Sequence, residues 1–228
     1  MAASLRRRSG QARRPRSGQA PRVLLATSNQ AKIRELSRSL ADLAIELVTP
    51  GALGTPPRVD ETGATFEENA RLKARAYAAW SGLPALADDG GLEVDALGGE
   101  PGVRSARWLG RDASDEELIA ATLERMRGVP PANRGAVMRL VVALVLPDGR
   151  EVLGEGTIRG VIAERATPAR DPGFPFRSVF YLPDLGKYYL ELTPEEHERI
   201  NHRRAALGPI RAALERHAAA PERPGTPP

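Results

Sequence analysis

The segment that most limits the fold is a short apolar run joined directly to an amphipathic helical pattern. Arg22–Thr27 (RVLLAT) is apolar enough to form a buried strand. Ser28 and Asn29 follow it, and both residue types favour a helix N-terminus. Apolar residues then recur at helical spacing over Gln30–Leu40. A buried strand that continues into an amphipathic helix favours a layered α/β protein.

The rest of the chain continues with alternating elements. A helix is predicted over Thr65–Trp80, because Thr65 and Glu68 form a capping box and Gly82 follows the helical pattern. The other predicted elements are strands at Ala85–Ala87, Leu92–Asp95, Val137–Leu146 and Glu151–Ile158, and helices over Ser114–Met126 and from Pro194 to at least Ala206, where Gly208 and Pro209 interrupt the pattern. The turn residues 147–149 (PDG) predict a hairpin. Early alternation followed by a hairpin indicates a mixed sheet.

Composition excludes several classes of site. At 228 residues the chain is long enough for one domain with a sizeable core, with or without two lobes. It has no cysteine, which excludes disulfides, thiolate metal sites and a cysteine nucleophile. Its three histidines are too few and too clustered to indicate a zinc site. No apolar run approaches the ~20 residues needed to cross a bilayer, so we expect no membrane association and a cytoplasmic location.

The net charge of +4 is unevenly distributed. Residues 1–22 carry seven arginines and no acidic residue, so the remainder has a small excess of acidic residues. We therefore expect a disordered arginine-rich tail over 1–21, a folded domain over 22–216 and a second disordered tail over 217–228. Because the folded part is not basic, no stable nucleic-acid complex is expected; a weakly RNA-binding tail remains an alternative.

Lysine usage points to particular positions. Of the 33 basic residues only three are lysines, namely Lys32, Lys73 and Lys187. Arginine fills the surface positions where either cation serves, so the remaining lysines are enriched at sites that need a compact ammonium group. Chance retention is the alternative, and we expect it to hold for at least one of the three.

The strand–helix junction at residues 27–32 is a candidate phosphate site. A helix N-terminus offers unpaired N–H groups and the positive end of the helix dipole. Thr27 and Ser28 add hydroxyl groups, and Lys32 lies one turn into the helix. The glycines of a Walker A loop are missing. By itself this signal is weak, because many strand-to-helix turns contain Ser and Asn.

Two pairs of acidic residues are candidates for metal binding and acid–base chemistry. Asp60 and Glu61 precede the Thr65 helix, and Asp88 and Asp89 stand at a predicted strand end before two glycines. Mg²⁺ prefers oxygen ligands and commonly uses one or two carboxylates together with substrate phosphates. One such carboxylate could also take a proton from an attacking water. Loop aspartates that cap turns are the alternative.

The predicted last helix carries Asn201, His202, Arg203 and Arg204 in sequence. His202 and Arg203 could contact the carbonyl edge of a purine or hold a phosphate. Considered alone, these residues are better explained by a charged, solvent-exposed helix face.

Taken in order, these segments strongly resemble the inosine-triphosphatase (XTP/dITP pyrophosphatase) family. The motifs are TSNQAK, ETGATFEENARLKARA, ADDGGLEVDALGGEPGVRSAR, the GK that ends at Lys187, and EEHERINHRRAAL, and they span residues 22–207. The resemblance implies an elongated mixed β-sheet flanked by helices, with a nucleotide cleft between two lobes. It implies Mg²⁺-dependent hydrolysis of purine nucleoside triphosphates with deaminated bases (ITP, dITP, XTP, dXTP) to the monophosphate and pyrophosphate, which keeps them out of DNA and RNA. It also implies a homodimer.

The resemblance assigns roles residue by residue. It implies that Glu61 and Asp89 bind the metal, and that Asp89 also accepts the proton. Lys187 matches a lysine near the substrate cleft, and His202 and Arg203 match the pair that contacts the base. The triphosphate-binding loop corresponds to Thr27, Ser28, Asn29, Gln30, Ala31 and Lys32.

The departures from the family pattern lie around the substrate. Gly90 stands where the family usually has serine, and His197 where it has a substrate-contacting lysine. The segment Gly173-Phe174-Pro175-Phe176-Arg177-Ser178-Val179-Phe180 replaces the family's GFGYDPIF, so arginine stands in place of an aspartate at position 177. Asp171 just upstream is a candidate partner for Arg177. These changes leave two alternatives open: a related pyrophosphatase with altered base preference, and a non-catalytic nucleotide- or RNA-binding protein.

Overall fold

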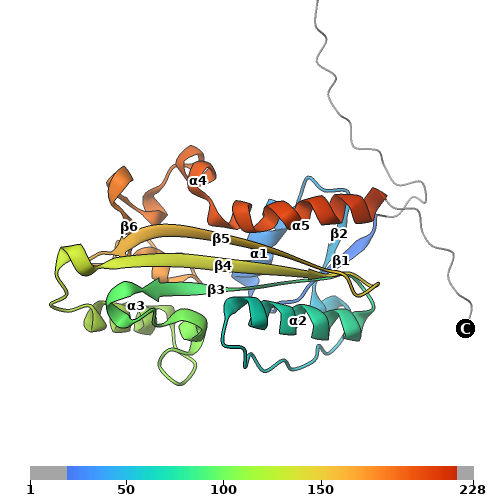
Figure 1. Cartoon of the computed structure of the whole chain (residues 1–228), viewed down its shortest axis with the longest axis horizontal. Coiled ribbons are helices and arrows are strands. Elements are labelled where there is room, and N and C mark those ends of the chain that lie inside the picture. Colours follow the sequence, from blue (N-terminus) through green and yellow to red (C-terminus); the bar gives the residue numbers. More distant parts are fainter. Residues whose placement is uncertain (1–19, 220–228) are drawn as a thin grey trace, which may run out of the picture.

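The fold is organised by one mixed sheet whose strands run in the order β2-β1-β3-β4-β5-β6-β7 (Figure 1). The computed structural model describes residues 20–219. Strand β1 pairs in parallel with β2 and β3, and the remaining neighbours are antiparallel. The strands are β1 Arg22–Leu25, β2 Glu46–Val48, β3 Ala85–Val94, β4 Gly135–Val145, β5 Glu151–Ile162, β6 Phe180–Leu182 and β7 Lys187–Tyr188. The predicted mixed α/β architecture is confirmed.

Helices cover both faces of the sheet. Alternate residues of a strand point to opposite faces and pack into the hydrophobic core on each side. Leu25 of β1 packs under α1 (Gln30–Ser39) and α5 (His202–Ala219), whereas its neighbour Leu24 packs under α2 (Phe66–Ser81). Figure 1 shows α5 and α2 on opposite sides of the long β4–β5 hairpin. Burial on alternating faces is what the period of two in a strand requires.

A third core lies toward the other end of the long strands. It gathers residues of α3 (Asp115–Arg125) and of the segment around Phe176 and Phe180. Within the described range, none of the helices combines the length and apolar character needed to cross a membrane. The molecule thus has cores at both ends of one long sheet, and the expected cleft between two lobes corresponds to the region between them.

Capping boxes fix two helix starts, and the sequence predicted the one formed by Thr65 and Glu68. Thr65 accepts from the backbone of Glu68, whose side chain returns to the backbone of Thr65, and Gly82 ends α2 in the left-handed conformation. The same arrangement of Thr193 and Glu196 begins α4 (Pro194–Ile200). The sequence prediction for the start of each of these helices is therefore confirmed.

Close contact between β5 and α5 depends on glycine. A Cβ atom at Gly154 would lie 1.8 Å from the carbonyl oxygen of Ala206, and one at Gly156 would lie 1.8 Å from that of His202. No side chain fits at these distances, so both glycines allow the helix backbone to lie directly on the strand. This contact determines where the first turn of α5 lies.

The prediction of two short strands separated by a loop at residues 88–91 is wrong. Strand β3 is continuous and pairs with β4 along its whole length, with Asp89 opposite Val141 and Gly90 opposite Leu140. The apolar β4 provides an unbroken partner, and this tertiary pairing overrides the local preference of Asp and Gly for turns. Gly91 is required here because its Cβ would lie 2.0 Å from Oγ of Ser105.

The predicted interruption of the last helix is also misplaced. The break lies at Asn201, which has an extended backbone and whose side chain accepts from the N–H groups of Arg203 and Arg204. Gly208 and Pro209 lie inside α5, on its exposed face. Water can solvate the carbonyl group that the proline leaves unpaired, while the buried face packs without interruption.

Candidate active site

A cavity of about 610 Å³ lies between the cores at the two ends of the sheet. Its walls come from the end of β1, from α1, α2, β3, β4 and α3, and from the segment around residues 173–177 and the start of α5. This volume is in the range of small-molecule sites. Two groups of lining side chains are called here the lysine end (Lys32, Glu61, Lys73, Asp88 and Asp89) and the arginine end (Phe174, Arg177, His202 and Arg203).

The β1–α1 junction forms one wall of the lysine end. Asn29 caps α1, and its side-chain oxygen accepts from the N–H groups of Ala31 at 2.9 Å and Lys32 at 3.3 Å. Thr27 in turn accepts from the N–H of Asn29 at 3.1 Å. The first turn of α1 contains no acidic residue. The positive end of the helix dipole therefore has no counter-charge in its own first turn.

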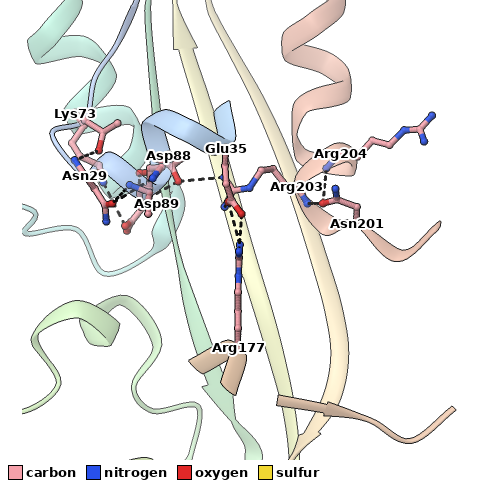
Figure 2. A network of polar contacts seen from close by, with 12 residues as sticks. Asn29, Glu35, Lys73, Asp88, Asp89, Arg177, Asn201, Arg203 and Arg204 are labelled. Carbon is pink, nitrogen blue, oxygen red and sulfur yellow. Dashed lines mark hydrogen bonds and ion pairs between the residues drawn. The ribbon is translucent and has the colours of Figure 1, made fainter. Parts of the chain in front are cut away.

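Two lysines hold the carboxylates of the lysine end. The ammonium group of Lys73 lies 3.4 Å from Glu61 and 3.5 Å from Asp89 (Figure 2). The ammonium group of Lys32 lies 3.2 Å from Asp88. Among the described residues, Oδ2 of Asp89 is buried without a hydrogen-bond partner. This end thus combines compact cations with a carboxylate oxygen that is free to bind a ligand.

Burial and charge separate the two adjacent aspartates. Burial raises the pKa of Asp89, because the positive charges of Lys73 and Lys32 offset only part of it. Burial also opposes ionisation of Asp88, but Lys32, Arg203 and Lys73 together hold its pKa below the ordinary value. For Lys73, burial is outweighed by Asp89, Asp88 and Glu61, and its pKa is raised. Asp88 is therefore a fixed anion, whereas Asp89 is the more easily protonated of the pair.

The arginine end is built around Glu35 of α1. Arg177 donates to its carboxylate at 2.7 and 3.1 Å, and Arg203 pairs with it at 2.7 Å (Figure 2). Arg177 also donates to Asp171 at 2.5 Å, which confirms the proposed pairing of these two residues. Burial works against the Glu35 anion, but the hydrogen bonds from Arg177 and the charge of Arg203 hold its pKa down. Glu35 therefore holds both arginines in place as their shared anion.

Both histidines near this end are neutral. Burial, assisted by the charges of Arg203 and Arg177, lowers the pKa of His202 to about 3. Burial and the charge of Arg177 lower the pKa of His197 as well. His197 packs against the ring of Tyr189, with ring centroids 4.8 Å apart. Neither imidazole adds a positive charge near neutral pH.

Most of the sequence-predicted site residues come together in the cavity. Those that line it are Thr27, Ser28, Asn29, Lys32, Glu61, Asp89, Gly90, Phe174, Pro175, Phe176, Arg177, His202 and Arg203. Four others do not. Gln30 and Ala31 belong to the first turn of α1 outside the lining, and His197 lies behind it. Lys187 on β7 pairs instead with Glu196 at 2.8 Å. The roles that the resemblance implies for these four stay predictions.

Three further residues carry much of the charge of the site: Glu35, Lys73 and Asp88. The scarcity of lysine singled out Lys73, and Asp88 was a candidate beside Asp89, whereas Glu35 was missed. No local signal distinguishes Glu35, since a glutamate on an amphipathic helix is ordinarily a solvated residue. Its role depends on arginines that are more than 140 positions away in the chain.

The fold and the cavity together define an α/β protein suited to an anionic ligand, with cations at a helix N-terminus and two carboxylates facing them. The Ham1 family model matches residues 23–213, and the chain belongs to that family. A dITP/XTP pyrophosphatase of Symbiobacterium thermophilum is 48% identical over 186 residues, which cover 82% of this chain and 91% of that protein. One of Thermus thermophilus is 48% identical over 196 residues, covering 85% and 90%. The solved structure of the Staphylococcus aureus Ham1 protein has a TM-score of 0.74 and 36% identity, covering 86% of this chain and 99% of that one.

Proposed function

We propose that this protein hydrolyses purine nucleoside triphosphates with deaminated bases, such as dITP, ITP and XTP, to the monophosphate and pyrophosphate. The observation that carries the proposal is the lysine end: two carboxylates held by Lys73, one of them with an unpaired buried oxygen, beside a capped helix N-terminus. The related proteins of Symbiobacterium and Thermus, named dITP/XTP pyrophosphatases, support the same reaction.

The lysine end fits a divalent cation, which we propose to be Mg²⁺. Glu61 and Asp89 line the same cavity, and both lie within 3.5 Å of the Lys73 ammonium group, so a positive charge already lies between them. Oδ2 of Asp89 offers the hard oxygen ligand that Mg²⁺ prefers. Glu61 and Asp89 would hold the ion, which would neutralise phosphate charge and polarise the phosphate oxygens when bound.

The residues of this chain divide the remaining work. Asp89 accepts the proton of the attacking water, because this residue lines the cavity and one of its carboxylate oxygens has no hydrogen-bond partner among the described residues. Lys32, Lys73 and the N-terminus of α1 stabilise negative charge on the triphosphate and on the departing pyrophosphate. Asp88 and Glu35 keep Lys32 and Arg203 in place.

The arginine end favours bases that carry carbonyl groups. Arg177 and Arg203 offer only donors, and both line the cavity. The keto oxygen of a deaminated purine accepts hydrogen bonds, whereas the amino group of adenine would face these donors with another donor. The mismatch would leave buried polar groups unpaired, which a binding site discriminates against strongly.

The decisive test is a panel of nucleotides with and without a chelator, using the wild type, Asp89→Asn and the exposed control Asp184→Asn. We expect pyrophosphate release from ITP, dITP and XTP that requires Mg²⁺. Asp89→Asn should lower kcat by about 10²–10⁴-fold, while Asp184→Asn should retain it. Full Mg²⁺-dependent activity in Asp89→Asn would contradict the mechanism, and a preference for canonical or pyrimidine nucleotides would contradict the assigned substrates.

We further propose that residues 22–216 form the complete catalytic unit, that the protein is a homodimer and that it acts in the cytoplasm. The family match over residues 23–213 supports the first of these. Removal of residues 1–21 should leave turnover unchanged. If the protein were instead an RNA binder that uses its tail, the truncation would abolish a salt-sensitive RNA affinity. Sedimentation of the full chain tests the dimer.

A further inference from the structure

The residue that departs most from the family pattern is fixed rigidly in the cavity wall. Arg177 is buried and forms ion pairs with carboxylates from two different segments. These are Glu35 of α1 and Asp171 of the loop just before Arg177. Its guanidinium carbon lies 3.7 Å from the centroid of the Phe174 ring, so the flat cation stacks on the aromatic face. Figure 2 shows the side chain extended toward Glu35. Two ion pairs and one stacking contact therefore hold the guanidinium group in place.

The acidic partners of Arg177 lie outside the cavity lining. Arg177 and Arg203 line the cavity, whereas Glu35 and Asp171 are not among the lining residues. Arg177 uses three of its five N–H groups on these carboxylates, which leaves two for a ligand. Nη1 of Arg203 makes no hydrogen bond among the described residues, but it lies 3.8 Å from the carboxylate of Asp88, which does line the cavity. Arg177 is therefore the cation of this end whose carboxylate partners all lie outside the lining.

Other charged and titratable groups near Arg177 do not reverse this pattern. Those packed around it are Glu35 of α1, Asp171 of the loop, Tyr189, His197 of α4, and His202 and Arg203 of α5. The pKa of Tyr189 is raised by burial, and the pKa values of both histidines are lowered, so these three groups are uncharged near neutral pH. Glu35 and Asp171, which balance Arg177, lie outside the lining, whereas Arg203 also lies 3.8 Å from Asp88, which lines the cavity.

Deaminated purines differ in the charge and in the hydrogen-bond acceptors that they present to an arginine side chain. Hypoxanthine has one keto oxygen, at position 6. Xanthine has keto oxygens at positions 2 and 6, and its ring loses the proton at position 3 just below neutral pH, so that it becomes an anion with a keto acceptor on each side of the N–H at position 1. A guanidinium group binds an anionic base with two keto acceptors more strongly than a neutral base with one.

We propose that Arg177 makes the arginine end selective for xanthine over hypoxanthine, so that XTP and dXTP are the preferred substrates of this protein. The inference rests on the proposed pyrophosphatase function and adds the base preference within it. It assigns Arg177 the part of a specificity residue that binds the base and leaves the hydrolytic step to the lysine end.

The test compares kcat/KM for XTP and ITP in the wild type, Arg177→Gln and Arg104→Gln. Arg104 is an exposed control that pairs only with Glu100 and lies outside the cavity lining. We expect the wild type and the control to prefer XTP by about tenfold or more at pH 8, the size of one charged hydrogen bond. In Arg177→Gln the preference should fall toward one. A preference that is unchanged in Arg177→Gln would overturn the proposal.

A second measurement does not depend on the variant folding. The XTP-to-ITP ratio of the wild type should decrease as the pH is lowered from 8 through the ionisation of xanthine, because the base then becomes neutral. A ratio that stays constant with pH, or a wild type that prefers ITP, overturns the inference but leaves the pyrophosphatase function standing. If the wild type releases pyrophosphate from neither nucleotide, the proposed function itself fails.

Discussion

The two ends of the cavity differ in their cations and in the position of the carboxylates that pair with these cations. At the lysine end, Lys73 sits between Glu61 and Asp89, and these carboxylates themselves line the cavity. At the arginine end, the guanidinium groups line the cavity and the carboxylate of Glu35 stands behind them. We therefore propose that the lysine end binds a metal and phosphates and that the arginine end presents donors to a base.

The choice of cation follows from what each end has to contact. A lysine ammonium group is a compact point charge that suits phosphate oxygens and a carboxylate pair. A guanidinium group is flat, stacks on an aromatic ring and donates along a planar edge, as Arg177 does on Phe174. In a chain with only three lysines, Lys32 and Lys73 both line the cavity. The comparison predicts that substitutions at the lysine end change hydrolysis, whereas substitutions at the arginine end change the choice of base.

The largest further effect is expected at Lys73. Lys73→Met removes the ammonium group between Glu61 and Asp89 but retains most of the apolar stem, so charge on the triphosphate loses a stabilising cation. We expect kcat to fall by about 10²-fold or more, with an equal loss for XTP and ITP. Steady-state kinetics with both nucleotides checks this. A changed XTP-to-ITP ratio would show that the two ends are not separable.

At the arginine end, Glu35→Gln should act mainly on stability. The substitution leaves Arg177 and Arg203 without their shared anion in a buried site, and breaking one partner of a buried ion network costs about 3 kcal/mol or more. Denaturant unfolding of the variant measures this loss. Glu198→Gln is the matched control, because Glu198 forms an exposed pair with Arg204, and the loss there should stay below about 1 kcal/mol. Equal stabilities for the two variants would contradict the buried network.

The smallest effect, counted per pH unit, is expected for His202. Its pKa is lowered to about 3 in the folded protein, against an ordinary value of about 6.5 when unfolded. Below pH 6.5 the unfolded chain therefore binds the proton more readily, and stability is lost as the pH falls toward 3. The loss is about 1.4 kcal/mol per pH unit at most. Comparing the unfolding free energy of the wild type and His202→Gln from pH 7 to 4 should show a shallower slope in the variant.

Local sequence signals predicted the fold well where they agreed with the tertiary structure. The capping box at Thr65 and the proline after Thr193 predicted two helix starts, because residues within one turn decide that geometry. The two wrong predictions, at residues 88–91 and 208–209, lie where tertiary contacts override the local sequence preference. The run Asp88-Asp89-Gly90-Gly91 stays in a strand because β4 pairs with it throughout, and Gly208-Pro209 stays in a helix because its buried face is packed.

The residues of the site likewise fall into those that sequence signals predicted and those that they missed. The residues that line the cavity were largely predicted from ordered motifs and the scarcity of lysine. Glu35 was not, because nothing near it in the sequence reveals two arginines brought together from residues 177 and 203. Conversely, the pairing of Arg177 with Asp171 was proposed from sequence proximity, and the structure confirms it.

The most direct test of the division between the two ends is a paired measurement on Asp89→Asn with a xanthine nucleotide. Pyrophosphate release from XTP should fall by about 10²–10⁴-fold, while the Kd of the product XMP, measured by calorimetry, should change by less than about threefold, since the arginine end is untouched. Loss of XMP binding together with turnover would contradict a separate base site. Retained turnover would contradict the catalytic role of the lysine end.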